Sequence, residues 1–550
     1  MKRNVGVLFI LLLGVLSVIP LFSPGYFPMH DDTQVARVIG MGNALREGQF
    51  PVRWVADLGY GYGYPIFNFY APLPYYFGGL LYALGVSSLV ATKIMFAIGV
   101  IAPAVILGLV MGFPAGVLSA ALYLLAPYHA VQIYVRGAVG EYWSLMFWPL
   151  IAAAFIGSDT GRGQKLNLLL GVIGISGVIL SHTLMGYVSV LFLAAVVLIT
   201  WFTRLIRGNF VAADFFYHVK TIGLGVGAAA FFWLPAIAEM GYTSVAGQVS
   251  ATAHYADHFV CISQLWSSLW GFAGSAPGCT DGMSFMLGKA HLLAGVLGLA
   301  AWIMVRPKEH RGLVIAGIGS IIVGLFFATE YSAFLWRILP GFAYLQYPWR
   351  FLSLVSFGFS IIGGIAVYHA PRGLIRAAVA AALTLFIVFM NLKWFTPQYI
   401  DSRKSTDFEA VSDMRWRVSK ISDEYLPRDL VRPKDASEVV FGTIDESDSL
   451  LVRTLSKTAT REHLSVISVV EDVVKINKAY FPGWRYFVNG KEVKPIITNG
   501  LPGIAIGVGK SEIVMVLTDT PVRILGNIIS LLSVIMVGIP LYGKRIKTKR

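Results

Sequence analysis

Two adjacent carboxylates, Asp31 and Asp32, follow an apolar segment at 5–22 that is long enough to cross a bilayer. Carboxylates in this position could bind a divalent cation, or one could act as a general base whose pKa is raised by its twin and by nearby lipid. They could also cap the helix predicted over 32–48, with Asp32 or Thr33 at the cap and Gly48 at the end. Capping and catalysis are compatible, so the acid pair remains a candidate catalytic or metal-binding site.

A second group of chemistry-bearing residues lies in YVRGAVGE, where Arg136 and Glu141 separate two apolar runs. A charge near the bilayer interior costs about 2.5 to 3.5 kcal/mol on insertion scales, so each of these side chains needs a partner. A mutual salt bridge would supply one, and an anionic lipid phosphate held by Arg136 is the functional alternative. His182 and Arg350 are expected at the same membrane face. Each is a weak candidate alone, but several cations would gather there with the acid pair, which favours a functional site.

The stretch from Arg53 to Tyr76 is dense in aromatic residues, which collect at membrane interfaces in any case. Gly59, Gly61 and Gly63 alternate with tyrosines and permit a backbone path closed to other residues, so the neighbouring rings could stack on a sugar or a lipid chain. The candidate substrate-binding residues of all these segments are His30, Arg37, Arg53, Tyr62, Tyr64, Arg136, Glu141, His182 and Arg350.

Several common chemistries have no support in this chain. The sequence contains no G-x-S-x-G, Walker A, H-E-x-x-H or G-x-G-x-x-G context, so serine hydrolysis, nucleotide hydrolysis, zinc proteolysis and dinucleotide binding are not indicated. A divalent cation at Asp31 and Asp32 is the one cofactor that these residues leave open.

The elements that must position these residues are membrane helices. The 550 residues are 56% hydrophobic and 13% charged, with a mean hydropathy of +0.67, values typical of a polytopic α-helical membrane protein. The first run lacks an A-x-A cleavage site, so we expect a retained signal anchor. Twelve runs of spanning length occur near 5–22, 92–111, 114–130, 142–157, 166–181, 184–203, 219–240, 288–305, 311–328, 351–369, 373–395 and 523–543. A shorter run at 72–85, interrupted by Pro74, suits a helix in the plane of the interface.

Basic residues favour one orientation of these spans. With the N-terminus in the cytoplasm, the short cytoplasmic segments carry 17 Lys and Arg, whereas the longer opposite loops carry eight. The same bias accounts for the net charge of +14, so nucleic acid is not an expected partner. We therefore expect a multi-pass plasma-membrane protein with both termini cytoplasmic and its active face extracytoplasmic.

The polar region from 396 to 521 differs from the rest of the chain. Its β-branched runs, such as SEVVFGTI, LLVRTL, HLSVISVV and EIVMVLT, alternate with turns that include Asn-Gly pairs at 489–490 and 499–500. We therefore expect a mainly antiparallel β-rich extracytoplasmic domain here. The remaining organisation is a transmembrane module over 1–395, with outer loops at 23–91 and 241–287, and a last helix with a basic tail over 522–550.

The two cysteines, Cys261 and Cys279, both lie in the outer loop 241–287. In an oxidising compartment a disulfide between them would constrain the loop by about 3 kcal/mol in the chain-entropy model. Two free thiols are the alternative, and zinc is not indicated because no histidine pair stands nearby at metal spacing.

Five motifs along the chain carry a family resemblance: HDDTQVARV, EGQFPVRW, GYGYPIFNFYAPLPYY, APYHAVQIYVRGAVGE and AYFPGWRYFVNGKEV. With a first span followed by an acidic outer loop, the chain resembles the glycosyltransferase C superfamily. It is more closely similar to bacterial and archaeal membrane proteins described as related to 6-pyruvoyl-tetrahydropterin synthase, and to the YfhO-like family. The resemblance implies an inverting transfer in which Asp31 or Asp32 takes the proton of an acceptor hydroxyl. On charge and position, Arg136 and Arg350 would then neutralise the leaving lipid phosphate, and Glu141 would orient Arg136 or the acceptor.

The expected function is therefore transfer of a sugar from a polyprenyl-phosphate donor to an extracytoplasmic glycan, lipid or protein acceptor during cell-envelope glycan biosynthesis. A transporter or flippase of lipid-linked glycans is the main alternative, and a noncatalytic glycan-assembly membrane protein is another. A transporter typically has polar or broken helices near the bilayer midplane, whereas the polar residues here gather at one mouth. That distribution favours chemistry at the membrane surface.

Overall fold

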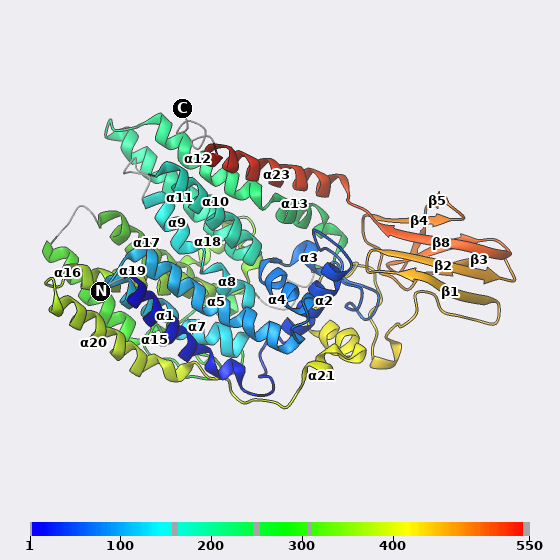
Figure 1. The fold of residues 1–550 in the computed structure, drawn as a ribbon, viewed down its shortest axis with the longest axis horizontal. Coiled ribbons are helices and arrows are strands. Elements are labelled where there is room, and N and C mark those ends of the chain that lie inside the picture. Colours follow the sequence, from blue (N-terminus) through cyan, green and yellow to red (C-terminus); the bar gives the residue numbers. More distant parts are fainter. Residues whose placement is uncertain (1–2, 157–162, 246–253, 306–309, 543–550) are drawn as a thin grey trace.

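The computed structural model describes residues 3–156, 163–245, 254–305 and 310–542 (Figure 1). Within these ranges, nine helical segments are long and apolar enough to span a membrane. They are α1 with η1 (Arg3–Phe22), α5 (Ser88–Met111), α8 with α9 (Val139–Ile156), α10 (Gln164–Ser181), α11 (Thr183–Ile206), α17 (Arg311–Ala328), η8 with α19 (Pro348–His369), α20 with η9 (Leu374–Trp394) and α23 (Pro521–Tyr542).

Two further helix pairs are long and apolar enough when taken together, but each is bent at a short break. The helix α6 (Ala115–Leu124) continues into α7 and η2 (Pro127–Arg136) through a 45° bend, and α12 (Ala212–Ala228) continues into α13 and η4 (Ala230–Tyr242) through a 68° bend. One more apolar helix, α16 (Lys289–Val305), has 17 residues. All twelve predicted spans are therefore helical in their described parts, and the chain is a multi-pass membrane protein. The predicted ends at 157 and 543, and the basic residues Lys2, Arg162, Arg306, Lys308 and those of the C-terminal tail, lie outside the described ranges.

The break after α6 places Arg136 beside the first outer loop. Pro127 begins α7, and the chain then widens into the π-helical turn η2 (Val131–Arg136), a distortion that often marks functional sites. The turn ends at Gly137, where φ is +64° and an added Cβ would lie 2.1 Å from Met29 Sδ. Only glycine fits this approach, so the end of η2 and the start of the first outer loop are held together.

The strands occupy 450–517 and form two antiparallel sheets (Figure 1). The larger sheet has the order β1 (Leu450–Lys457), β2 (Arg461–Ser468), β8 (Gly509–Leu517), β4 (Trp484–Val488) and β5 (Lys491–Val493). The smaller has β3 (Asp472–Lys475), β7 (Leu501–Ile506) and β6 (Ile496–Thr498). The two Asn-Gly pairs join β4 to β5 and β6 to β7 with φ between +49° and +79°, which confirms the predicted hairpin turns.

The strand predicted within SEVVFGTI, at 437–444, does not form, and that prediction was wrong. The backbone N–H of Val440 donates to the carbonyl of Tyr60 at 3.2 Å, and its carbonyl accepts from Arg415 at 2.6 Å. The segment is therefore held by the 57–64 loop and by an arginine side chain, and no neighbouring strand pairs with it. Residues 396–449 carry short helices and isolated bridges, among them α21 (Ser405–Glu409), η10 (Asp413–Val418) and α22 (Ser419–Ile421).

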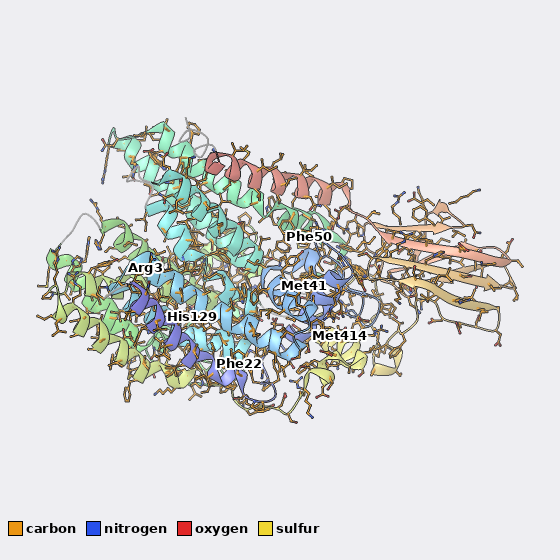
Figure 2. All side chains as sticks on the ribbon, viewed as in Figure 1. Arg3, Phe22, Met41, Phe50, His129 and Met414 are labelled. Atoms are coloured by element: carbon orange, nitrogen blue, oxygen red, sulfur yellow. A yellow bond between two sulfur atoms is a disulfide. The ribbon has the colours of Figure 1, made fainter. Side chains whose placement is uncertain are left out.

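The β region stands at one end of the helical bundle. Helix α1 (Arg3–Val18) begins at Arg3, far from the sheets, and continues through η1 to Phe22, which lies nearer to them (Figure 2). Helix α23 runs from the sheets back along the bundle, while α2 (Gln34–Arg46), α3 (Ile66–Phe69), α4 (Leu73–Ala83) and α21 lie between bundle and sheets (Figure 1). Helices α2, α3 and α4 of this intermediate layer all belong to the predicted outer loop 23–91.

Candidate functional site

The acid-pair loop and the Arg136 segment are joined by their backbones. The N–H groups of His30 and Asp31 donate to the carbonyls of Val135 and Arg136 at 3.0 and 3.1 Å. The side chain of Gln34 donates to the carbonyl of Gly137 at 2.8 Å. Two segments that are about one hundred residues apart in sequence are therefore hydrogen-bonded side by side. One carries the Asp31 carboxylate and the other carries the Arg136 guanidinium.

Asp31 keeps an accessible carboxylate. Its Oδ2 accepts from Gln34 Nε2 at 3.0 Å, and its Oδ1 accepts from the Thr33 hydroxyl at 3.1 Å. The guanidinium of Arg37 lies farther off, at 3.5 Å, and the Asp31 side chain is 33% exposed. Among the described residues, no backbone N–H of α2 donates to Asp31 or Asp32, and Thr33, the cap residue, makes no side-chain cap bond. Helix capping therefore does not account for the pair.

Asp32 is held by two arginines from far along the chain. Its Oδ2 lies 2.8 Å from Arg417 Nη1 and 3.2 Å from Arg403 Nη1, and its side chain is 17% exposed. Both arginines belong to residues 401–425, which we call the strap. The strap is also fixed to the first outer loop by a two-way backbone pair between Asp401 and Tyr26, at 2.7 and 3.0 Å. The two carboxylates thus differ: Asp32 is paired with two guanidinium groups and is 17% exposed, whereas Asp31 has one, more distant guanidinium partner in Arg37 and is 33% exposed.

The strap brings a further carboxyl group close to Asp31. Arg37 is buried beneath the ring of Tyr70, with 4.0 Å between guanidinium and ring centroid, and its Nη2 donates to Ser422 Oγ at 3.3 Å. Ser422 in turn donates to Glu424 at 3.3 Å. Burial raises the pKa of Glu424, and the nearby Arg37 opposes that shift. Sequence patterns did not single out Glu424, Arg403 or Arg417.

Arg136, Glu141 and Arg350 form a buried ionic cluster. Glu141 Oε2 lies 2.7 Å from Arg136 Nη1 and 3.7 Å from Arg350 Nε, and its Oε1 accepts from Tyr128 and Gln132. The predicted Arg136–Glu141 salt bridge is formed, but one carboxylate faces two guanidinium groups. The cluster therefore carries one excess positive charge. Among the described residues, the buried Nε of Arg350 has no acceptor within hydrogen-bond distance, and Glu141 Oε2 lies 3.7 Å away. Both features suit an added anion.

The two predicted histidines have structural contacts. The Nε2 of His30 donates to the carbonyl of Phe272 at 2.9 Å, which ties the first outer loop to the loop 241–287. The Nδ1 of His182 accepts from the backbone N–H of Met185 at 3.1 Å and so caps α11. In the same outer loop, Cys261 and Cys279 are joined by a disulfide.

The glycine-tyrosine segment packs beneath the strap. Gly59, Gly61 and Gly63 all have positive φ, from +66° to +87°, and a Cβ at Gly63 would lie 2.4 Å from the Trp54 ring. The hydroxyl of Tyr64 contacts Ser422 Oγ at 3.4 Å and accepts from the Tyr425 N–H. Tyr62 instead lines a cavity of about 470 Å³ between the 430–438 segment and the smaller sheet. The predicted unusual backbone path is therefore present, and its two tyrosines face different neighbours.

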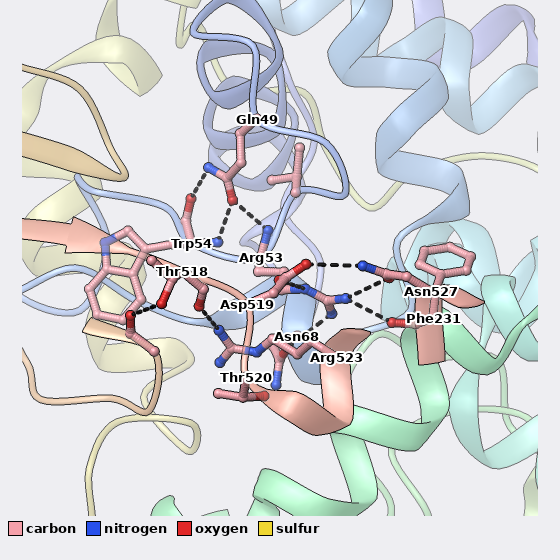
Figure 3. Close-up of polar contacts among 12 residues, drawn as sticks. Gln49, Arg53, Trp54, Asn68, Phe231, Thr518, Asp519, Thr520, Arg523 and Asn527 are labelled. Carbon is pink, nitrogen blue, oxygen red and sulfur yellow. Dashed lines mark hydrogen bonds and ion pairs between the residues drawn. The ribbon is translucent and has the colours of Figure 1, made fainter. Parts of the chain in front are cut away.

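Arg53 belongs to a polar network with Asn68, Phe231 and Asp519 (Figure 3). Its guanidinium donates to Asn68 and to the carbonyl of Phe231 at 3.1 and 3.0 Å, and lies 3.6 Å from Asp519. This network fastens the first outer loop to the bend of α12–α13 and to the start of α23. The nearby Trp484, like Tyr486, is buried in the β region.

The acid pair does not form a set of metal ligands. Within the described ranges, no three His, Cys, Asp or Glu side chains come together as a metal-binding group. Because the Asp32 carboxylate is occupied by two guanidinium groups, the residues present do not fit a divalent cation. We derive no step through a metal.

Comparisons with known proteins give a limited likeness. No family model matches the sequence, and no curated protein does. An arabinofuranosyltransferase, AftD, from Mycobacteria aligns over 74% of this chain and 28% of its own, with 14% identity and a TM-score of 0.46. An Archaeoglobus fulgidus oligosaccharyltransferase, tethered to an acceptor peptide, aligns over 81% of this chain and 61% of its own, with 12% identity and a TM-score of 0.44. This chain thus spans less than two thirds of either structure. Because neither TM-score reaches 0.5, we base the functional proposal on the residues of the chain itself.

Proposed function

We propose that this protein is an inverting membrane glycosyltransferase that uses a polyprenyl-phosphate sugar, with Asp31 as its general base. The observation that carries the proposal is the pairing of an accessible carboxylate with a net-positive buried cluster. The backbone N–H of Asp31 donates to the carbonyl of Arg136, so the proposed base and the first cation belong to adjacent, hydrogen-bonded backbone segments.

The reaction balances with these groups alone. The acceptor hydroxyl transfers its proton to the Asp31 carboxylate, and its oxygen bonds to the anomeric carbon of the sugar. The bond from that carbon to the phosphate oxygen breaks, and the electron pair leaves with the polyprenyl phosphate. Attack opposite the leaving group inverts the anomeric centre.

The excess charge of the Arg136–Glu141–Arg350 cluster matches the leaving group. A lipid phosphate becomes more negative as the sugar departs, and guanidinium groups recognise phosphate oxygens through directed hydrogen bonds. A permanently paired Arg136–Glu141 couple would be neutral. Arg350 supplies the additional charge, and its buried Nε offers an unused donor.

The distribution of basic residues and the contacts between loops support one orientation in the membrane. Basic residues favour cytoplasmic termini, and the loops assigned to the other side contact one another in the layer between bundle and sheets. We therefore propose a plasma-membrane protein with an extracytoplasmic active face and an extracytoplasmic glycan, lipid or protein acceptor.

The test is turnover of purified protein in lipid nanodiscs with a panel of radiolabelled polyprenyl-phosphate monosaccharides. Release of polyprenyl phosphate together with a glycosylated acceptor of inverted anomeric configuration would support the proposal. Donors that bind with no transfer to any acceptor, together with movement of labelled donor between the leaflets of liposomes, would favour a transporter. A product of retained configuration would refute the single-displacement mechanism.

A further inference from the structure

Two short segments on the outer side of the bundle expose an unusual density of large apolar residues. One is α15 (Ile262–Trp266) with the residues that follow it, and the other is η6 (Glu330–Ser332) with α18 (Ala333–Ile338). Six of their side chains, which we call the apolar rim, are between 57% and 78% exposed: Ile262, Trp266, Leu269, Tyr331, Phe334 and Ile338. Apolar patches of this kind on a folded protein mark an interaction surface.

The two segments are side by side. The N–H of Val260 donates to the carbonyl of Ala328 at 2.9 Å, and Trp336 stacks on Tyr255 and meets Phe259 edge-on, at 5.2 and 5.9 Å between ring centroids. The residues directly before α15 therefore pack against the end of α17 and against α18, which brings the two segments together. Their apolar side chains remain more than half exposed, although Trp266 contacts Lys289 and Phe334 contacts Phe326.

The rim continues the membrane-facing surface of two helices. Helix α17 ends at Ala328, directly before η6, and α16 begins at Lys289, whose Nζ lies 5.4 Å over the Trp266 ring. Both helices expose apolar side chains along their length, including Val296 on α16 and Ile322 on α17. The rim therefore lies where the hydrocarbon-facing surface of the bundle ends.

Its composition is that of a bilayer interface. Trp and Tyr have an apolar body and a polar tip and collect at the level of the headgroups. Lys289 and Arg337 are exposed beside these rings and suit lipid phosphates. An apolar patch separated from the membrane helices would indicate a protein partner. The rim instead adjoins the membrane helices α16 and α17, which favours lipid.

We infer that the apolar rim is embedded in the interfacial region of the outer leaflet, and that lipid is the partner it binds. The rim is connected to the ionic cluster in two steps. The N–H of Phe285 donates to Ser268 Oγ, next to Leu269, at 3.2 Å, and Phe285 stacks on Trp349, over whose ring Arg136 lies at 4.3 Å. The embedded loops would thus set the depth of the cluster relative to the headgroups. This inference rests on the membrane helices and holds whether or not the chain transfers sugar.

The test is depth-dependent quenching on the full-length protein in nanodiscs of phosphatidylcholine and phosphatidylglycerol. The two native cysteines form a disulfide, so Leu269→Cys and Phe334→Cys can be labelled singly with a fluorescent NBD group. Val508→Cys, in the turn between β7 and β8, is the matched control because Val508 is also an exposed apolar residue. Val296→Cys marks the hydrocarbon region.

We expect a lipid carrying a spin label at carbon 5 to quench both rim labels at least threefold more strongly than the Val508 label. Aqueous iodide should show the opposite order, and a lipid labelled at carbon 12 should quench the Val296 label most. Equal iodide quenching at the rim and at Val508 would overturn the inference. Rim labels shielded from both iodide and spin-labelled lipid would also overturn it, because a second protein chain would then cover the rim.

Discussion

Glu141→Gln tests the electrostatic account of the ionic cluster. The substitution keeps the size of the side chain and removes the one carboxylate that Arg136 and Arg350 share. The net charge of the cluster then rises from +1 to +2 inside a buried site. The new amide has only one acceptor oxygen, whereas the carboxylate accepts from two sets of donors. Its NH₂ group would therefore face either the guanidinium groups or the donors of Tyr128 and Gln132.

The loss of stability expected in Glu141→Gln depends on how deeply the pair is buried. Glu141 is 1% exposed, and the two arginine side chains are 10% and 12% exposed, so solvent screens this pair little. Removing one partner of a buried pair costs about 3 to 5 kcal/mol, since the remaining charge stays buried and uncompensated. A bound lipid phosphate would replace the missing charge. Ligand at one hundred times its dissociation constant adds about 2.7 kcal/mol of stability.

The assay is thermal unfolding in nanodiscs, with and without polyprenyl phosphate, and with neutral polyprenol as the lipid control. We expect polyprenyl phosphate to raise the melting temperature of Glu141→Gln more than that of the wild type. The matched control is Glu239→Gln, because Glu239 forms an equally buried pair with Arg523 in a different network. Glu239→Gln should have a lower melting temperature than the wild type, and polyprenyl phosphate should not restore it more than polyprenol does. Equal recovery in both variants, or none in Glu141→Gln, would refute the reasoning.

Three further predictions follow from the strap and the glycine segment. Burial raises the pKa of Glu424, so its contribution to stability is complete below the unfolded pKa and is lost as pH rises through the folded pKa. The melting temperature of Glu424→Gln should therefore rise relative to that of the wild type between pH 4.5 and 7.5. A difference that stays constant with pH would contradict this. Gly63→Ala should lower stability by roughly 1 to 3 kcal/mol in thermal unfolding, since it adds strain at positive φ and a Cβ 2.4 Å from Trp54. Asp32→Asn should speed amide hydrogen exchange in 401–425 at least tenfold, because both anchoring ion pairs are lost; unchanged protection would show that the strap is held elsewhere.

Features encoded locally could be predicted from the sequence. A span needs only a sufficiently long apolar run, so the nine helices of spanning length, the two bent pairs and the shorter helix α16 were all predicted as apolar helical segments. The Asn-Gly turns and the positive φ values at Gly59, Gly61 and Gly63 follow from single residues. The Arg136–Glu141 pair was also within reach, because its members are five positions apart and neither can remain alone in a membrane.

Features that depend on distant contacts could not be predicted. Asp32 and Arg403 are 371 positions apart, and no local pattern links them. The segment SEVVFGTI has good β propensity, but tertiary contacts with the loop at Tyr60 override it. Arg53 has the same residue type as the cluster arginines, yet its partners come from α3, from the bend of α12–α13 and from the start of α23.

The central claim is that Asp31, and not Asp32, removes the proton from the acceptor. The most direct measurement is single-turnover sugar transfer by Asp31→Asn and Asp32→Asn in nanodiscs, with donor affinity measured alongside. A positioned general base contributes roughly 10²- to 10⁴-fold, so we predict a loss of that size in Asp31→Asn with donor affinity retained. Asp32→Asn should lose less. Wild-type turnover in Asp31→Asn, or a complete loss confined to Asp32→Asn while hydrogen exchange shows an intact strap, would contradict the account.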